Sequence, residues 1–181
     1  MPPRLFCNSI SMNPSPDNLD AEALYQTLLT QIQAHTKDAP NLALVGIRSG
    51  GAWIAERMAK DLRLENPPGF IDVSFYRDDY AKKGLPATVK PTQIPFNVEN
   101  ATILLIDDIL YTGRTTRAAI NELFDYGRPA KIMLATLIDR GCRELPIAAD
   151  FVAATISLSQ NQVLELHRTD DHLFSLTVEH A

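Results

Sequence analysis

The sequence predicts an α/β protein with a central parallel sheet flanked by helices. Short apolar runs, which are typical of buried strands, alternate along the chain with longer segments of helical periodicity. This alternation favours a parallel sheet with right-handed crossovers. In addition, the apolar runs 42–47 and 103–106 are each followed by a glycine-containing turn and then by a helical segment. Both turns therefore fall at the carboxyl end of a strand, where open α/β sheets bind their ligands.

At the N-terminus, the sequence predicts a segment without regular secondary structure. Residues 1–18 contain four prolines with several Asn and Ser, and we expect a flexible arm ahead of a single domain at 19–181. The first helix is expected at 19–34, because Leu24, Leu28 and Ile32 form one apolar stripe. The elements that follow are a buried strand at 42–47, a tight glycine turn at 48–51, a crossover helix at 52–62 and a further strand at 70–75.

A long segment without periodicity separates these elements from the second half of the domain. Residues 76–101 read as a loop with at most edge strands, and a loop of this length in a compact domain is usually functional. After it we expect a strand at 102–106, a helix at 115–126 and a strand at 131–138, followed by shorter apolar pieces near Phe151, Val163 and 173–178.

Composition narrows the class of protein. With 45% hydrophobic and 22% charged residues, the 181-residue chain has the make-up of a soluble globular protein. No apolar run approaches the ~20 residues of a membrane span, and the N-terminus lacks the apolar core of a signal peptide. Cys7 and Cys142 are too few for a disulfide framework or a zinc site, so we expect a cytoplasmic protein without a membrane partner. The formal net charge of −5 disfavours, without excluding, binding to nucleic acid.

The most informative stretch runs from residue 103 to residue 115. Asp107 and Asp108 follow the apolar run, and ionised carboxylates only accept hydrogen bonds, which suits a pair of sugar hydroxyls. In the turn that comes next, Thr115 is placed to cap the following helix. Turn amides and the positive end of a helix together form a phosphate cradle. We therefore expect a ribose 5-phosphate site, with a turn made of Tyr111, Thr112, Gly113, Arg114 and Thr115.

A second glycine turn lies one strand–helix unit earlier in the chain. It consists of Arg48, Ser49, Gly50 and Gly51. Two consecutive glycines let backbone amides approach an anion closely, and the Arg48 and Ser49 side chains add hydrogen-bond donors. The alternative is an ordinary turn between a strand and a helix.

The run from Ile103 to Thr115 resembles the signature of type I phosphoribosyltransferases, which bind 5-phosphoribosyl-1-pyrophosphate (PRPP). The resemblance implies the type I phosphoribosyltransferase fold, with a small C-terminal hood formed by about residues 140–181. It also implies that catalytic Asp107 and Asp108 hold the ribose hydroxyls, that the 111–115 turn holds the 5-phosphate and that the 48–51 turn holds pyrophosphate. Mg²⁺ is implied as a cofactor bound mainly through PRPP and pyrophosphate, with no metal site built from protein ligands.

The loop that begins at residue 76 is implied to act as a lid over the reacting centre. Such a lid excludes water, which would trap a transition state that resembles an oxocarbenium ion. Arg77 would neutralise the departing pyrophosphate and is a third catalytic candidate. Where Gly50 stands, the family often has a further basic residue, so this chain departs from the family's pyrophosphate loop.

A second run, Arg140-Gly-Cys-Arg-Glu-Leu-Pro146, is similar to the base-binding side of the PyrR family, which combines uracil phosphoribosyltransferase activity with attenuation of pyrimidine operons. The resemblance covers about residues 19–155. It implies that a homodimer or larger homo-oligomer converts uracil and PRPP to UMP and pyrophosphate, and that UMP promotes binding of the leader RNA of a pyrimidine operon. The residues implied to frame the base are Ile138, Asp139, Arg140 and, on the hood, Val163.

Two other functions remain open from the sequence. An RNA-binding regulator with little catalytic activity would need a continuous basic face, and the Arg and Lys residues are scattered along the chain. A purine phosphoribosyltransferase commonly has an Asp at the position of Tyr111, where it contacts the purine. Tyr111 cannot serve as that carboxylate, which favours a pyrimidine.

Overall fold

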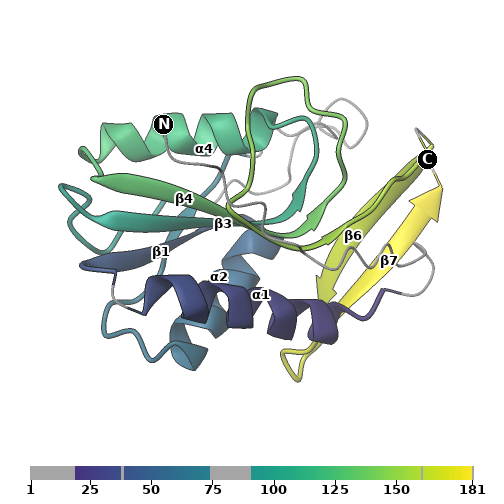
Figure 1. The fold of residues 1–181 in the computed structure, drawn as a ribbon, viewed down its shortest axis with the longest axis horizontal. Coiled ribbons are helices and arrows are strands. Elements are labelled where there is room, and N and C mark those ends of the chain that lie inside the picture. The colour runs from purple at the N-terminus through teal and green to yellow at the C-terminus, as the bar shows by residue number, and fades with distance from the viewer. Residues whose placement is uncertain (1–18, 38, 74–90, 160, 181) are drawn as a thin grey trace, which may run out of the picture.

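Five parallel strands form the central sheet, in the order β2, β1, β3, β4 and β5 (Figure 1). The structure is a computed structural model that describes residues 19–37, 39–73, 91–159 and 161–180. Within these ranges, no helix is both long enough and apolar enough to cross a membrane. The strands are β1 (Leu42–Ile47), β2 (Gly69–Ile71), β3 (Thr102–Leu110), β4 (Lys131–Asp139) and β5 (Phe151–Thr155).

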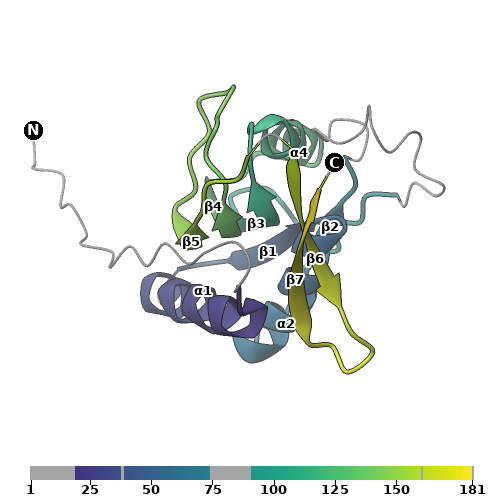
Figure 2. The same ribbon diagram turned by 90° about the vertical axis from the view of Figure 1, so that its right-hand side faces the viewer.

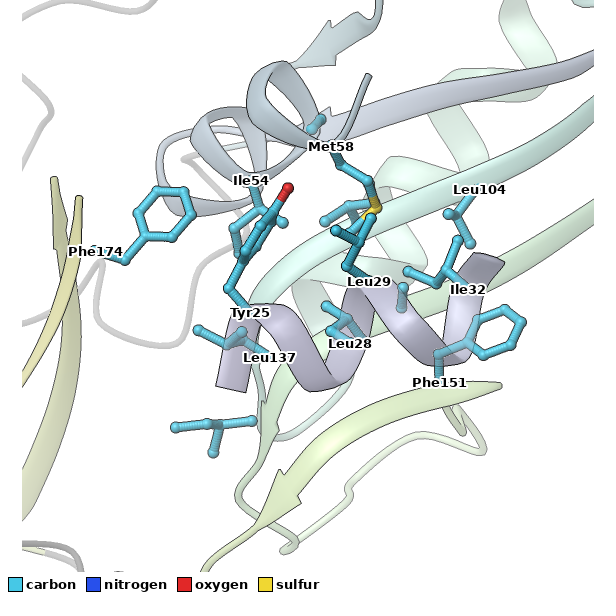
Figure 3. Packing of buried hydrophobic residues seen from close by; sticks show 14 of the residues in the cluster. Tyr25, Leu28, Leu29, Ile32, Ile54, Met58, Leu104, Leu137, Phe151 and Phe174 are labelled. Atoms are coloured by element: carbon cyan, nitrogen blue, oxygen red, sulfur yellow. The ribbon is translucent and has the colours of Figure 1, made fainter. Parts of the chain in front are cut away.

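Helices cover both faces of this sheet (Figure 1). Helices α1 (Ala21–Thr36) and α2 (Gly50–Asp61) pack on one face, and α4 (Arg114–Asp125) packs on the other. Asp20 caps α1, since its carboxylate accepts hydrogen bonds from the amides of Glu22 and Ala23. The expected apolar stripe on α1 faces the sheet, where Leu28 and Ile32 are fully buried beside residues of α2 (Figure 3).

The strand order creates a crevice for a ligand beyond the carboxyl ends of β1 and β3. The chain leaves β1 through α2 on one face and leaves the neighbouring strand β3 through α4 on the opposite face. Beyond the carboxyl ends of two such strands a crevice opens, and open α/β proteins bind ligands there. Both turns singled out in the sequence follow these two strands.

A separate antiparallel hairpin, β6 (Gln162–Arg168) and β7 (Phe174–His180), ends the described chain. Figure 2 shows this hood hairpin standing in front of the carboxyl ends of the central strands, on the side of β1 and α2. The hood was expected to comprise about residues 140–181, but the hairpin begins only at Gln162. Residues 151–155 instead pair with β4 as an edge strand, because Phe151 is buried against α1 there.

Several predicted boundaries need correction. Strand β3 continues through Asp107 and Asp108 to Leu110, because its pairing with β4 does not stop at Ile106. Helix α2 begins at Gly50, so the glycine turn is part of its first turn. Helix α4 has Gly113 at its N-cap, so Thr115 does not cap it.

Further differences concern the second strand and the loop after it. Strand β2 ends at Ile71, short of the predicted 70–75, and its Phe70 forms an antiparallel bridge with Gln93 at the edge of the sheet. The predicted arm at 1–18 lies outside the described residues, as do residues 74–90 with the lid candidate Arg77.

Candidate active site

A cavity of about 330 Å³ lies between the carboxyl ends of β1 and β3 and the hood hairpin. Five segments supply its walls: the turn after β1 with the start of α2, the end of β3, the turn before α4, the residue just after β4, and strand β6. The lining residues are Arg48, Ser49, Gly50, Trp53, Asp107, Asp108, Ile109, Tyr111, Thr115, Arg140, Val163, Leu164, Glu165, Leu166 and His167. Nine of the sixteen predicted site residues are thus brought to one cavity.

The two adjacent acids lie at the centre of this cavity. Asp107 is buried, with 5% of its surface exposed, and its Oδ1 accepts a hydrogen bond of 3.0 Å from the amide of Asp108. The Asp108 carboxyl lies directly against Gly50, because a Cβ atom on Gly50 would be 2.3 Å from its Oδ2. The acids of β3 and the first turn of α2 therefore form one continuous surface.

In the turn after β1, three residues line the cavity and a fourth packs against β3. Arg48, Ser49 and Gly50 line the cavity, and the peptide between Arg48 and Ser49 is cis. The Arg48 guanidinium lies 5.1 Å from the centre of the Phe70 ring. Gly51 is a packing residue, since a Cβ there would be 2.2 Å from the carbonyl oxygen of Ile106. Only glycine allows α2 to approach β3 this closely.

The turn before α4 contributes its two ends to the cavity. Tyr111 and Thr115 line it, whereas Thr112, Gly113 and Arg114 do not. Gly113 has a φ of 93°, which other residues rarely adopt, and a Cβ there would lie 3.1 Å from Ile147. Arg114 lies at the surface and donates from Nε to Glu144 at 3.0 Å.

The residues expected to frame a base are split in the same way. Arg140 and Val163 line the cavity, and the Arg140 guanidinium stacks 4.3 Å from the centre of the Tyr111 ring. Ile138 does not line it, because its side chain is fully buried in the core. Asp139 does not line it either, since its carboxylate accepts hydrogen bonds from Arg143 Nη2 at 2.6 Å and from the Gly141 amide at 2.8 Å.

Arg143 is a functional neighbour that sequence reasoning did not single out. Besides Asp139, its guanidinium donates to the carbonyl oxygens of Tyr111 at 2.6 Å, Gly141 at 3.1 Å and Ile147 at 3.0 Å. It thereby ties the loop after β4 to the turn that carries Tyr111. No periodicity marks such a residue, because most of its partners are backbone carbonyls, and one of them belongs to the distant Tyr111.

Six further cavity residues were not predicted as site residues. Trp53 follows Gly50 by three positions on a helix, a spacing that places both on the same face and could have indicated it. Ile109 follows the two acids on β3. The others lie on β6 and could not be placed from sequence, because nothing in the chain predicts where the hood hairpin docks. They are Leu164, Glu165, Leu166 and His167, and they make that strand, with Val163, one wall of the cavity.

Comparisons with known proteins place this geometry in a family. Residues 17–167 match the phosphoribosyl transferase domain family. A protein of Ralstonia nicotianae named Bifunctional protein PyrR is 54% identical over 152 residues, which cover 83% of this chain and 87% of the relative. This chain belongs to the PyrR family of phosphoribosyltransferases. A second PyrR of this name, from Nitrosococcus oceani, is 42% identical and covers 90% of this chain and 94% of its own length.

Solved structures of the wider family share the fold. A hypoxanthine-guanine phosphoribosyltransferase from Bacillus anthracis matches with a TM-score of 0.61 at 17% identity, over 80% of this chain and 86% of that chain. A hypoxanthine phosphoribosyltransferase from Staphylococcus aureus gives a TM-score of 0.59 at 23% identity, over 81% and 78%. At these identities the likeness concerns the fold alone. The predicted PyrR family and the predicted type I phosphoribosyltransferase fold are confirmed.

Proposed function

We propose that this PyrR-family protein transfers the phosphoribosyl group of PRPP to N1 of uracil, giving UMP and pyrophosphate. The observation that carries the proposal is the convergence of three parts on one cavity. These parts are the paired acids of β3, the glycine turn of α2 and the turn that opens α4. A sugar that carries a phosphate at one end and a pyrophosphate at the other has complementary groups for all three.

The chemistry assigned to the acids follows from their position. The carboxylates of Asp107 and Asp108 accept hydrogen bonds from the two ribose hydroxyls and orient the ring. As the bond from C1 of ribose to pyrophosphate breaks, positive charge develops at C1, and the nearby negative charges stabilise it. The new bond forms from uracil N1, which loses its proton.

The phosphate groups have two cradles. Arg48, Ser49 and Gly50, at the N-terminal end of the 12-residue helix α2, would hold pyrophosphate, with Arg48 supplying charge. The 111–115 turn would hold the 5-phosphate at the start of α4. Arg77 remains a prediction for the departing pyrophosphate.

Magnesium fits this site as an ion that arrives with the substrate. Among the described residues, no group of three His, Cys, Asp or Glu side chains could hold a metal. Asp107 and Asp108 offer two carboxylates, and Mg²⁺ is commonly bound by one or two carboxylates together with water and substrate phosphates. When bound, the ion would neutralise charge on the pyrophosphate.

The base would lie between the Tyr111–Arg140 stack and Val163 of β6. Tyr111 and Arg140 present no carboxylate to a purine, and Asp139, the acid expected beside the base, is bound to Arg143 instead. This supports a pyrimidine. Ile138 acts on the base only through the core packing of β4.

The test is a side-by-side assay of uracil, hypoxanthine, guanine and orotate at saturating PRPP and magnesium. We expect UMP from uracil and little product from the other bases. Faster turnover of hypoxanthine or guanine would replace this proposal with a purine phosphoribosyltransferase.

A second activity is proposed for the same chain: UMP-dependent binding of the leader RNA of a pyrimidine operon, by a homodimer or larger homo-oligomer in the cytoplasm. Its support is membership of a family whose relatives are named bifunctional. Titration of leader RNA with and without UMP, at several salt concentrations, tests it. We expect UMP to tighten binding, which requires a higher affinity of UMP for the RNA-bound state, and a steep salt dependence from phosphate contacts. Turnover of uracil without RNA binding would mean that the protein is an enzyme without the regulatory role. RNA binding without turnover would mean that it is a regulator with little catalytic activity.

A further inference from the structure

Besides its apolar packing, the hood hairpin forms polar contacts with the helices below it at two places. At the end of β6, Arg168 Nη1 donates to Glu56 Oε2 of α2 at 2.6 Å, and its guanidinium lies 5.4 Å from the centre of the Trp53 ring. At the start of β7, the amide of Phe174 donates to Glu22 Oε1 of α1 at 2.7 Å. The two attachments differ in their surroundings, and the difference indicates what each one does.

The attachment on β7 is part of the hydrophobic core. The Phe174 ring meets the fully buried Tyr25 ring edge to face at 5.5 Å, and Figure 3 shows both among the core residues. Arg57 binds both oxygens of Glu22, at 2.7 and 2.8 Å, and stacks 4.2 Å from the Tyr25 ring centre. Such an arrangement supports the fold as a whole.

The attachment on β6 lies beside the cavity. We name Arg168, Glu56 and Trp53 the hood anchor. Trp53 itself lines the cavity, and the side chains of Arg168 and Glu56 remain partly exposed, at 28% and 44%. Arg168 lies on the same face of β6 as the buried Leu164 and Leu166, so it faces the helices rather than the solvent. The anchor therefore lies at the end of the strand whose Leu164 and Leu166 pack in the core, at the margin of that packing.

Helix α2 joins the anchor to the pyrophosphate cradle. Its first residue, Gly50, touches Asp108, and Trp53 and Glu56 follow about one and two turns later. A rigid helix thus holds the anchor at a fixed distance from the acids. The Arg168–Glu56 contact, together with the buried Leu164 and Leu166, then connects the β6 wall to the helix that carries the proposed pyrophosphate cradle.

We propose that Arg168 is a positioning residue that, through Glu56 and Trp53, sets the place of the β6 wall and thereby the apparent affinity for the base. This inference rests on the proposed function. It predicts an asymmetry between the substrates, because the proposed PRPP site lies on β1, β3 and the first turns of α2 and α4, and the packing of these elements on the central sheet holds it without the hood. Loss of the anchor weakens base binding and leaves PRPP binding unchanged.

The test is steady-state kinetics of Arg168→Met with uracil and PRPP varied separately. We expect the KM for uracil to rise about tenfold, the combined scale of a partly exposed ion pair and a cation–π contact. The kcat and the KM for PRPP should stay within about twofold. Arg168→Lys keeps the charge and should raise the KM for uracil by less than about threefold. In a double-mutant cycle, Glu56→Gln should add little to Arg168→Met.

Arg128→Met is the matched control, since it removes an exposed arginine between α4 and β4 and should change none of these constants. An unchanged KM for uracil in Arg168→Met, or parallel loss in kcat and both KM values, would overturn the proposal. If the wild-type protein does not turn over uracil, the proposed function fails separately, and amide hydrogen exchange then tests the anchor. Arg168→Met should speed exchange in the hood hairpin and leave α4 unchanged, and equal exchange in the hairpin would refute the anchor.

Discussion

At the scale of single residues, the two glycines that open α2 have different tasks. A Cβ on Gly51 would collide with the backbone carbonyl of Ile106 at 2.2 Å, whereas a Cβ on Gly50 would collide with the side chain of Asp108 at 2.3 Å. Backbone in a central strand cannot move without disturbing the sheet, but a carboxylate can change its rotamer. Gly51 thus serves packing and Gly50 serves the site.

Alanine substitutions should separate these tasks. Gly51→Ala should lower the free energy of unfolding by about 2–3 kcal/mol, as overpacking in a well-packed region does. Gly50→Ala should cost less stability and instead raise the KM for PRPP, because it displaces the Asp108 carboxyl. Urea unfolding and steady-state kinetics of both variants measure the two effects. Equal stability losses with unchanged kinetics would contradict the division.

The paired acids give a second prediction at this scale. Replacing Asp107 and Asp108 with Asn keeps their size and removes the charges that face the developing cation. We expect a rate loss on the order of 10²–10³, the scale of losing one preorganised electrostatic contact. Single-turnover kinetics at saturating substrates measure it, and near-normal turnover of the double variant would remove both residues from the proposed mechanism.

At the scale of elements, the loop after β4 depends on Arg143. Its guanidinium binds Asp139 and the carbonyl oxygens of Tyr111, Gly141 and Ile147. Arg143→Met would leave the half-buried Asp139 without its ion-pair partner, and we expect a loss of about 2 kcal/mol in unfolding free energy. Glu144→Gln, in the more exposed pair with Arg114, should cost less than about 1 kcal/mol. Urea unfolding compares them, and similar losses would show that Arg143 has no special part in the loop.

Most of the helices and strands could be predicted from the sequence, but the positions at which they end could not. Apolar runs placed β1, β3 and β4 within a few residues, because a strand buried on both faces must be apolar throughout. The end of β3 was predicted too early. Asp107 and Asp108 remain in the strand because its backbone hydrogen bonds to β4 do not depend on the polarity of the side chains. Asp139 was assigned to the base from the resemblance to the PyrR family, and the sequence does not show that Arg143 binds its carboxylate.

At the scale of the whole molecule, one carboxylate joins three elements. Glu22 of α1 accepts hydrogen bonds from Arg57 of α2 and from the amide of Phe174 in β7, so it links the hood hairpin to both helices. The hydrogen bonds from Arg57 hold the pKa of Glu22 below its ordinary value of 4.5. The same carboxylate helps to hold the pKa of the Arg57 guanidinium above its usual value, and burial with the Asp61 contact raises that of Tyr25.

This link should make stability depend on pH in a defined direction. A carboxyl group with a lowered folded-state pKa contributes its full stabilisation above its unfolded value of 4.5, and loses it as the pH falls through the folded-state pKa. At pH 7, Glu22→Gln should therefore lower the melting temperature by about 2–4 °C, the effect of roughly 1 kcal/mol in a chain of this size. The difference from wild type should shrink in acid. Thermal unfolding of both proteins from neutral to acidic pH measures it, and a constant difference would exclude this electrostatic role.

Trp53 is the sole tryptophan of the chain and stands in the wall of the cavity. Indole absorbs and emits at longer wavelengths than the phenol ring of tyrosine, so tryptophan fluorescence excited selectively comes from this one ring. Binding of the proposed nucleotide or base beside that ring would change its surroundings, and we expect the wavelength and intensity of its emission to change as well. The unlabelled protein thus carries its own optical probe, with which stopped-flow mixing can time each ligand's entry and order the steps of binding.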